Sequence, residues 1–316
     1  MMRAWYFIAF LLFPTIVSAW DNTGHEVVAG IAWDNMQPAV RVKAIALLQG
    51  ATDDDCLKAL FPTDSRPRAE REREFFIRAA TWPDIIRDGD CEDLSHPNWH
   101  FADHFWKGFS GGTGANAPHD AGKPTPSPNA IEQLTTFRDI VPCKTAPCAA
   151  NAERAEDLAW ILHLVGDVHQ PLHNAARITT QSPKGDRGGN DFHLEPDDLP
   201  LHTYWDHIID NSVAIRSTEK GHHQLAYIKR LITMIEHDHP RESMANDLQT
   251  VDFAAWSAEG FKTAEEMAYP ESLKPNEEEH PAPTEMYRKE VFAACDRAIA
   301  LAGYRLADLL THMLTP

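Results

Sequence analysis

The arrangement of apolar residues along this chain is helical rather than strand-like. Apolar positions recur every three or four residues in successive segments, and runs that alternate apolar with polar residues are nearly absent. We therefore predict a mainly α-helical fold with long irregular loops. The predicted helices cover residues 23–36, 38–48, 69–80, 130–141, 158–173, 202–211, 222–236, 244–259 and 286–312, and the predicted loops cover 88–104, 107–129 and 177–190.

The segment Leu158–His173 is the centre of this pattern. On a helix its aliphatic residues form one stripe, and Trp160 and Leu164 flank the opposite side, so the helix is apolar nearly all round and should be buried. His163 and Asp167 are four residues apart and share one face, so they can bind one metal ion between them. A buried hydrogen-bonded His–Asp pair would explain the same two residues. This segment alone leaves both interpretations open.

The first nineteen residues have the composition of a secretory signal peptide. Arg3 provides a basic start, residues 5–13 are almost wholly apolar, and the small residues before Trp20 suit a cleavage site after Ala19. The apolar run is too short to span a membrane. We expect one mature domain, residues 20–316, that is exported to the periplasm or secreted, is monomeric and has no stable association with a membrane.

The cysteines fit an oxidising compartment. Cys143 and Cys148 are close enough in sequence to form a small disulfide loop, and Cys56 with Cys91 is a plausible second bridge. Cys295 falls in a helical pattern and would then be a buried thiol. The pairing itself remains open from the sequence.

The charge excludes one class of partner. A formal net charge of −18 argues against a duplex-binding surface, which normally has clustered lysine and arginine. It does not exclude a polyanionic substrate if bound cations supply local positive charge. The 17 histidines point in that direction.

Several further residues suit zinc, which is bound in proteins by histidine nitrogen and carboxylate oxygen. Trp20 and His25 would open the mature chain, and removal of the leader frees an α-amino group that can chelate a metal; otherwise Trp20 is simply an apolar terminus. Asp84 precedes Arg87 by one turn, and it could instead cap a helix. His100 lies between two aromatic residues, where a core histidine is also plausible.

A second pair has the spacing of the central helix. His202 and Asp206 are again four residues apart, as His163 and Asp167 are. Together with His173, two such pairs in one exported helical domain are hard to explain as core packing. The sequence therefore indicates a cluster of metal ligands.

Taken together, these motifs resemble the S1/P1 family of zinc-dependent nucleases. The order and local spacing of the motifs match from the first tryptophan of the mature chain to the last aspartate. The matching motifs are Trp20-x4-His25, Trp82-Pro83-Asp84-x2-Arg87, Trp99-His100-Phe101-Ala102-Asp103, His163-x3-Asp167-x5-His173, Gly188-Gly189-Asn190 and His202-x3-Asp206.

The resemblance implies a mainly α-helical fold of the type that this family shares with zinc phospholipase C, and three zinc ions per chain. The first ion would be held by Asp84, His100, His163 and Asp167. The second would be held by His173, His202 and Asp206. The third would be held by the amine and carbonyl of Trp20, by His25, and by Asp167 as a bridge.

The resemblance also implies an activity and its substrate-side residues. An exported endonuclease would hydrolyse single-stranded DNA or RNA to 5′-phosphate products by a zinc-activated water, with 3′-nucleotides as further candidate substrates. Asp84 would orient that water. Phe101 matches the family's base-stacking aromatic residue and Asp103 its base-edge acceptor, while Arg87 and Asn190 match positions that face the phosphate.

Two alternatives remain from the sequence. A zinc-dependent phospholipase C has a similar trinuclear site, but that group spaces its N-terminal tryptophan and first histidine more widely and ends its ligand set with glutamate rather than aspartate. Trp20-x4-His25 and Asp206 therefore favour the nuclease. A non-catalytic exported zinc-binding protein would usually contain a histidine-rich tract, and none occurs here.

Overall fold

The computed structural model describes residues 20–88, 91–114, 117–144, 146–212, 225–273 and 281–315. The expected signal peptide and its cleavage site lie outside these residues, so the division of the chain into a leader and one mature domain stays a prediction. No helix in the described ranges is long and apolar enough to cross a membrane.

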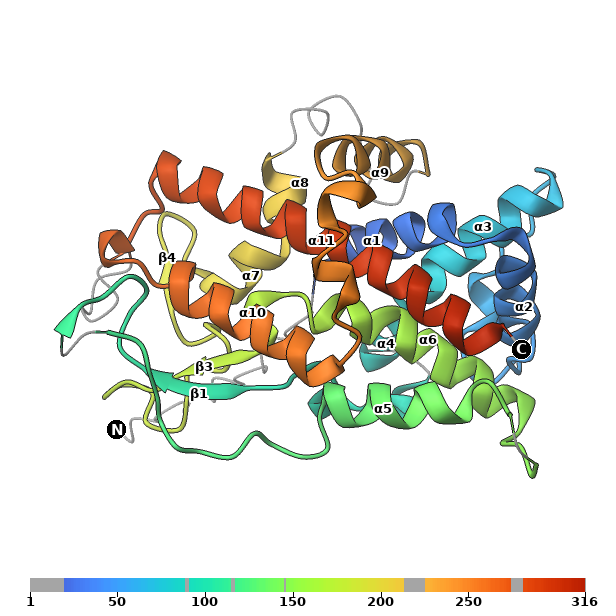
Figure 1. Cartoon of the computed structure of the whole chain (residues 1–316), viewed down its shortest axis with the longest axis horizontal. Helices are drawn as coiled ribbons and strands as arrows, with labels where there is room; N and C mark the ends of the chain where they lie inside the picture. Colours follow the sequence, from blue (N-terminus) through green and yellow to red (C-terminus); the bar gives the residue numbers. More distant parts are fainter. Residues whose placement is uncertain are drawn as a thin grey trace, which may run out of the picture.

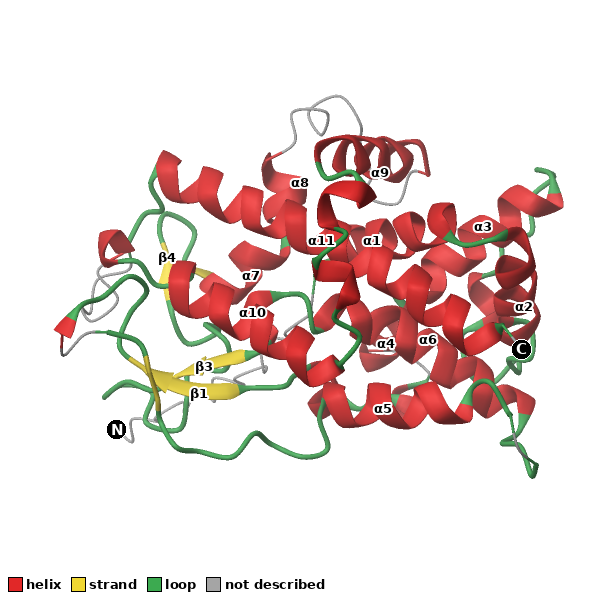
Figure 2. Cartoon of the chain, in the orientation of Figure 1, coloured by secondary structure: helices red, strands yellow, loops and turns green. Residues whose placement is uncertain are grey.

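Helices make up most of the described structure, which confirms the mainly α-helical prediction (Figure 2). Strands are few and short. The helices are α1 (Asn22–Asn35), α2 (Pro38–Leu48), α3 (Arg68–Ala79), α4 (Trp82–Ile85), α5 (Ala130–Ile140), α6 (Asn151–Asp167), α7 (Leu201–Asp206), α8 (Ile208–Ser212), α9 (Leu225–Asp238), α10 (Phe253–Met267) and α11 (Glu285–Leu314).

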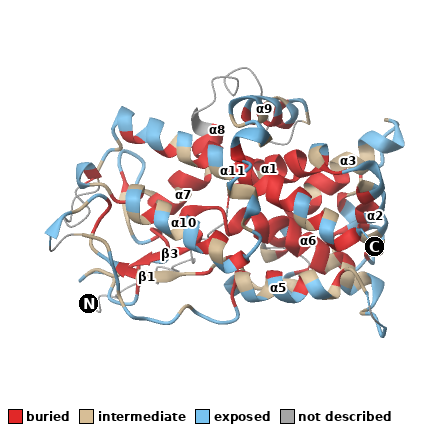
Figure 3. Ribbon diagram, viewed as in Figure 1, coloured by how far each residue is buried: buried red, intermediate tan, exposed pale blue. Residues whose placement is uncertain are grey.

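Helix α6 lies between other helices, with α1 and α11 on one side and α5 alongside on the other (Figure 1). All residues from Leu158 to Asp167 are buried, as the all-round apolar pattern predicted (Figure 3). The helix begins earlier than the predicted segment, at Asn151, and ends at Asp167. Its last turn therefore delivers Asp167 to the interior of the protein.

A small sheet places two loop segments side by side. Strand β1 (His104–Lys107) pairs in parallel with β3 (Ala175–Arg177) and antiparallel with β2 (His119–Asp120). Just before this pairing, the backbone amide of Ala102 donates to the carbonyl of His173 at 2.9 Å. The sheet thus holds the chain after His100 against the chain after His173.

A hairpin leads into the last candidate ligands. Strands β4 (His193–Leu194) and β5 (Leu199–Pro200) pair antiparallel, and α7 begins directly after β5. The predicted helix 202–211 is in fact two short helices, α7 and α8, because the chain turns at His207.

Other predicted boundaries need correction. The predicted helix 244–259 starts at Phe253 instead, because Asp252 caps it by accepting from the amide of Ala255 at 2.8 Å, and residues 241–249 form 3₁₀ turns. Capping fixes this start, which hydrophobic spacing cannot do. Residues 222–224 of another predicted helix lie outside the described residues, and its described part is α9, Leu225–Asp238.

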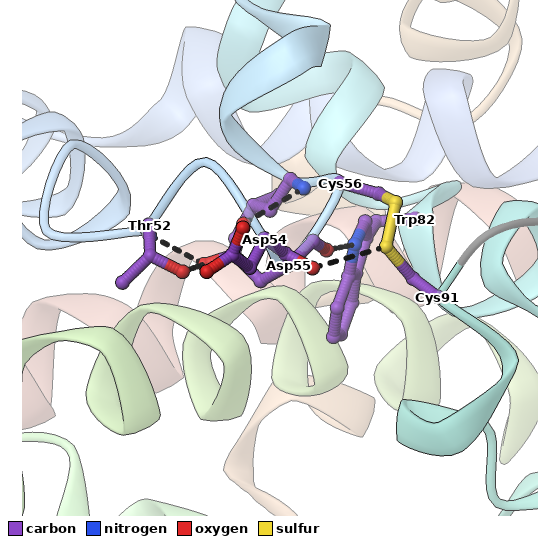
Figure 4. Close-up of a disulfide and its surroundings, with 7 residues drawn as sticks. Thr52, Asp54, Asp55, Cys56, Trp82 and Cys91 are labelled. Carbon is purple, nitrogen blue, oxygen red and sulfur yellow. Dashed lines mark hydrogen bonds between the residues drawn. A yellow bond between two sulfur atoms is a disulfide. The ribbon is translucent and has the colours of Figure 1, made fainter.

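Two disulfides are present, Cys56–Cys91 and Cys143–Cys148, and Cys295 is a buried free thiol, as expected. Beside the first bridge, the indole of Trp82 donates to the carbonyl of Asp55 at 2.7 Å (Figure 4). Trp82 is the first residue of α4, which carries Asp84. The bridge therefore anchors the helix that presents one candidate ligand.

The buried acid Asp157 on α6 generates a stability prediction. Burial, with Glu153 and Glu156 nearby, raises the pKa of Asp157 to about 7, and one of its oxygens has no hydrogen-bond partner among the described residues. Because the unfolded-state pKa is near 3.8, ionisation opposes folding progressively from about pH 4 to pH 7 and fully above that. Asp157→Asn should raise the melting temperature at pH 8 and much less at pH 5; an equal rise at both values would contradict this assignment.

Candidate metal centre

The carboxylate of Asp167 lies at the meeting point of three histidines. His163 Nε2 lies 3.3 Å from Asp167 Oδ2, His100 Nδ1 lies 3.1 Å from the same oxygen, and His25 Nε2 lies 3.4 Å from Oδ1. These side chains come from α6, from the 3₁₀ turn η4 (Pro97–His100) and from α1. Their side chains are completely or almost completely buried.

One group of possible metal ligands consists of Asp84, His100 and His163, whose donor atoms lie within 4.8 Å of one another. His163 Nε2 lies 2.9 Å from His100 Nδ1 and 3.9 Å from Asp84 Oδ1. His163 Nδ1 donates to the carbonyl of Ala80 at 2.8 Å. Since a carbonyl only accepts, Nε2 carries the lone pair of the neutral ring and faces the group.

A second group consists of His173, His202 and Asp206. The Nε2 atoms of the two histidines lie 3.0 Å apart, and His202 Nε2 lies 3.6 Å from Asp206 Oδ2. The Nδ1 atoms of His173 and His202 donate to the carbonyls of His100 and Gly188 at 2.7 and 2.8 Å. Backbone carbonyls thus orient both rings, as they do around ligating histidines in general.

A third group consists of His25, His163 and Asp167, with Trp20 beside it. The fully buried indole of Trp20 donates to the carbonyl of Gly166 at 3.0 Å. The ring of His25 stacks on that of His163 with centroids 3.8 Å apart. The structure therefore brings the first residue of the expected mature chain to the same centre.

This donor set fits divalent cations. In the second group two lone pairs face each other at 3.0 Å, an arrangement that repels unless a proton or cation lies between them. In the described part of the protein, both nitrogens of His25, Nε2 of His100 and Oδ1 of Asp167 are buried without a hydrogen-bond partner. Imidazole and carboxylate are the ligands that zinc prefers. Metal ions would satisfy buried atoms that are otherwise costly to desolvate.

Burial keeps most of these imidazoles neutral. It lowers the pKa of His25, His100 and His173 well below the usual value, and that of His202 to about 4. A shared proton is therefore a poor occupant of the second group, which favours a metal ion there.

The remaining ionisable ligands behave differently. Burial would lower the pKa of His163, but the carboxylates of Asp167 and Asp84 outweigh it and leave that pKa raised. Burial raises the pKa of Asp167 to about 6 and that of Asp206 well above its usual value. Without cations, negative charge is unfavourable at these carboxyl groups.

Two of the predicted substrate-side residues, Phe101 and Arg87, lie beside candidate ligands. The ring of Phe101 is partly exposed and lies 5.0 Å from that of His173, and Arg87 Nη1 lies 3.2 Å from Asp84 Oδ1. Asp103 has a buried oxygen with no partner in the described ranges, and burial raises its pKa to about 7. Asn190 is buried and donates to the carbonyl of Arg187 at 2.6 Å, so its side chain is already engaged.

Several supporting residues were missed by sequence reasoning. The amide of Gln170 donates to Asp206 Oδ1 at 2.6 Å and orients that carboxylate. The buried Asp186 accepts from the hydroxyl of Tyr269 and from the backbone amide of Arg177. For Gln170, the one sequence signal of a supporting role was its position as a polar residue between the candidate ligands Asp167 and His173. The distant partner of such a residue cannot be found without coordinates.

Gly166 provides a test of this packing. A Cβ atom at Gly166 would lie 2.8 Å from His25 Nδ1 and 3.6 Å from the indole of Trp20. We expect Gly166→Ala to displace His25 and lower the bound metal, measured by elemental analysis of the purified protein. Gly303→Ala is the matched control, because its Cβ would meet the side chain of Ile31 at 2.6 Å. It should lower the melting temperature without lowering the metal content; equal metal content in both variants would refute the proposed geometry.

Comparison with known proteins agrees with this arrangement. Nuclease S1 from Aspergillus oryzae (strain ATCC 42149 / RIB 40) is 26% identical over 198 residues, which cover 63% of this chain and 57% of that relative. The match thus spans little more than half the length of the curated relative. A family model described as S1/P1 Nuclease matches residues 20–315, nearly the whole chain after the expected leader. Because this family model covers nearly all of the chain, and the structure brings together three groups of candidate histidine and carboxylate ligands, the chain belongs to the S1/P1 nuclease family.

Proposed function

We propose that this protein is an exported zinc-dependent endonuclease that hydrolyses phosphodiester bonds of single-stranded DNA or RNA to 5′-phosphate products. The observation that carries the proposal is the convergence of three groups of histidine and carboxylate donors around the end of α6. Family membership supports the nuclease class. The two disulfides suit an oxidising compartment outside the cytosol. Export to the periplasm or medium, a monomeric state and the absence of stable membrane association remain predictions.

Three zinc ions are proposed, on the ligand sets implied by the family motifs. Side chains within each set lie near one another in the structure. The first set is Asp84, His100, His163 and Asp167; the second is His173, His202 and Asp206; the third is Trp20, through its freed amine and its carbonyl, with His25 and Asp167.

Bound zinc would supply positive charge for the phosphoryl oxygens and lower the pKa of water from near 16 to roughly 7. Asp84 would accept a hydrogen bond from the attacking water and so orient it toward phosphorus. Its partner Arg87, 3.2 Å away, would donate to a phosphate oxygen as charge accumulates there. Asn190 would need to exchange its bond to the Arg187 carbonyl for one to the phosphate.

A preference for unpaired strands follows from Phe101. Its partly exposed ring beside His173 can stack on a base only if that base is free of a duplex. Asp103, with an unpartnered oxygen, would bind the edge of the stacked base. The same arrangement would admit 3′-nucleotides. The three cations would let a protein with net charge −18 hold a polyanion.

The deciding experiment compares substrates on the purified mature protein. Single-stranded DNA, single-stranded RNA, duplex DNA and phosphatidylcholine vesicles are incubated with and without EDTA, and the product ends are identified by phosphatase sensitivity and mass. We expect hydrolysis of single strands, 5′-phosphate ends, and loss of activity with EDTA that zinc restores. Cleavage of phosphatidylcholine alone would establish the phospholipase C alternative. Bound zinc without any hydrolysis would establish a zinc-binding protein.

Asp84→Ala should reduce turnover by roughly 100-fold or more, because an orienting acceptor for the attacking water is lost. Bound zinc should be largely retained, since His100, His163 and Asp167 remain. Asp191→Ala is a suitable control. It removes the ion pair between Asp191 and Arg187, which is more exposed than that of Asp84 with Arg87 and whose closest atoms are 2.6 Å apart. Near-normal turnover in Asp84→Ala would discard the proposed role.

Phe101→Ala should weaken binding of single-stranded oligonucleotides by about 1–3 kcal/mol, or roughly 5- to 150-fold in KM, because the stacking platform is removed. Turnover should fall less than binding. Phe261→Ala, which removes a ring that stacks on His104 instead, should leave KM unchanged. An unchanged KM in Phe101→Ala would argue against base stacking at this residue.

A further inference from the structure

Asp21, the residue after Trp20, uses both carboxylate oxygens and its backbone amide in contacts with other residues. The carboxylate of Asp21 is almost fully buried; Oδ1 caps α1 by accepting from the amide of Gly24 at 3.0 Å, and Oδ2 lies 2.9 Å from His207 Nδ1. The backbone amide of Asp21 also lies 3.5 Å from the carbonyl of Asp206. One side chain thus joins the start of α1 to the turn between α7 and α8.

A second connection reinforces the first. Thr23, on the first turn of α1, donates to Asp210 Oδ2 at 3.2 Å, and the hydroxyl of Tyr227 donates to Asp210 Oδ1 at 2.6 Å. Asp210 lies on α8 and Tyr227 on α9, and both are buried. The first turn of α1 is therefore attached to two other helices by buried polar contacts, just beyond Trp20.

These contacts matter because chain termini are normally mobile. The first residues of a domain fray unless they are tied down, and fixing one backbone residue costs roughly 1–2 kcal/mol of conformational entropy. A terminal amine that fluctuates would be a poor metal ligand. The hydrogen bond from the Trp20 indole to the Gly166 carbonyl fixes the side chain of Trp20. The contacts of Asp21 fix the backbone that follows it.

We propose that Asp21 is a positioning residue that, with His207, holds the α-amino group of Trp20 in place for the third zinc ion. This inference rests on the proposed function, since it takes the freed amine as a ligand. It adds a role for two residues that ligate no metal. Asp21 acts through Trp20, and His207 acts through Asp21.

The test measures zinc binding rather than turnover. Mature protein beginning at Trp20 and a form that retains Ala19 are each prepared with and without Asp21→Ala, and bound zinc is counted over a range of buffered free zinc concentrations. Asp21→Ala should raise the free zinc needed to fill the third ion by roughly tenfold or more, as loss of outer partners of metal ligands does. The other two ions should fill as in the unsubstituted protein. In the form with Ala19, where no amine is free at Trp20, Asp21→Ala should have no effect on zinc.

Two further variants separate positioning from general stability. Asp21→Asn keeps an oxygen for the Gly24 amide and a polar group for His207, so it should restore zinc binding. Asp252→Ala removes the matched cap of α10, where Oδ1 accepts from Ala255 at 2.8 Å, and should lower the melting temperature without changing the zinc count. If Asp21→Ala does not fold, His207→Ala replaces it and should weaken the third ion alone.

The inference is overturned if Asp21→Ala fills the third zinc site at the same free zinc concentration as the unsubstituted protein. It is equally overturned if the loss persists in the form with Ala19, or if Asp252→Ala produces the same loss. Failure of the proposed function has a different signature. Unsubstituted protein with Ala19 in place would then hold three zinc ions as tightly as the mature form.

Discussion

The burial of Asp167 among neutral imidazoles is the constraint on which the rest of the site depends. A carboxylate with no exposed surface needs positive charge or donors nearby. Its neighbours His25 and His100 resist protonation because burial lowers their pKa values. Only His163 is pushed the other way, by the carboxylates beside it. Divalent cations resolve this imbalance best, because their positive charge stabilises the carboxylates and the lone pairs of the imidazole rings can bind them.

The fold serves this centre by bringing distant segments to the end of one helix. Helix α6 is surrounded by other helices and stops at Asp167 (Figure 1). The parallel pairing of β1 with β3 aligns the segments after His100 and after His173. The Cys56–Cys91 bridge lies next to Trp82 and so steadies α4. These candidate ligands are thus held by elements that are themselves anchored, as a preorganised metal site requires.

Much of this could be predicted from local patterns. Helix spacing placed α1, α2, α3, α5 and α11 to within about two residues, because each has a periodic apolar face. The i, i+4 spacing of His163 and Asp167 correctly placed both on one buried face. The predicted start of α10 was wrong, because the actual start depends on the cap at Asp252. The break at His207 was missed, because a short turn between two helices hardly changes the spacing of the apolar residues.

Local patterns in the chain were enough to indicate the class of chemistry, since residue type decides which atoms can bind zinc and helical spacing decides which of them share a face. They also indicated the helical class, because the apolar period is a local property. Three contacts became visible only in the folded chain: His173 and His202 face each other at 3.0 Å, Gln170 orients Asp206, and Asp21 joins α1 to His207. These contacts span about 30 to 190 residues of chain. Their geometry arises from packing of whole elements, which no local pattern encodes.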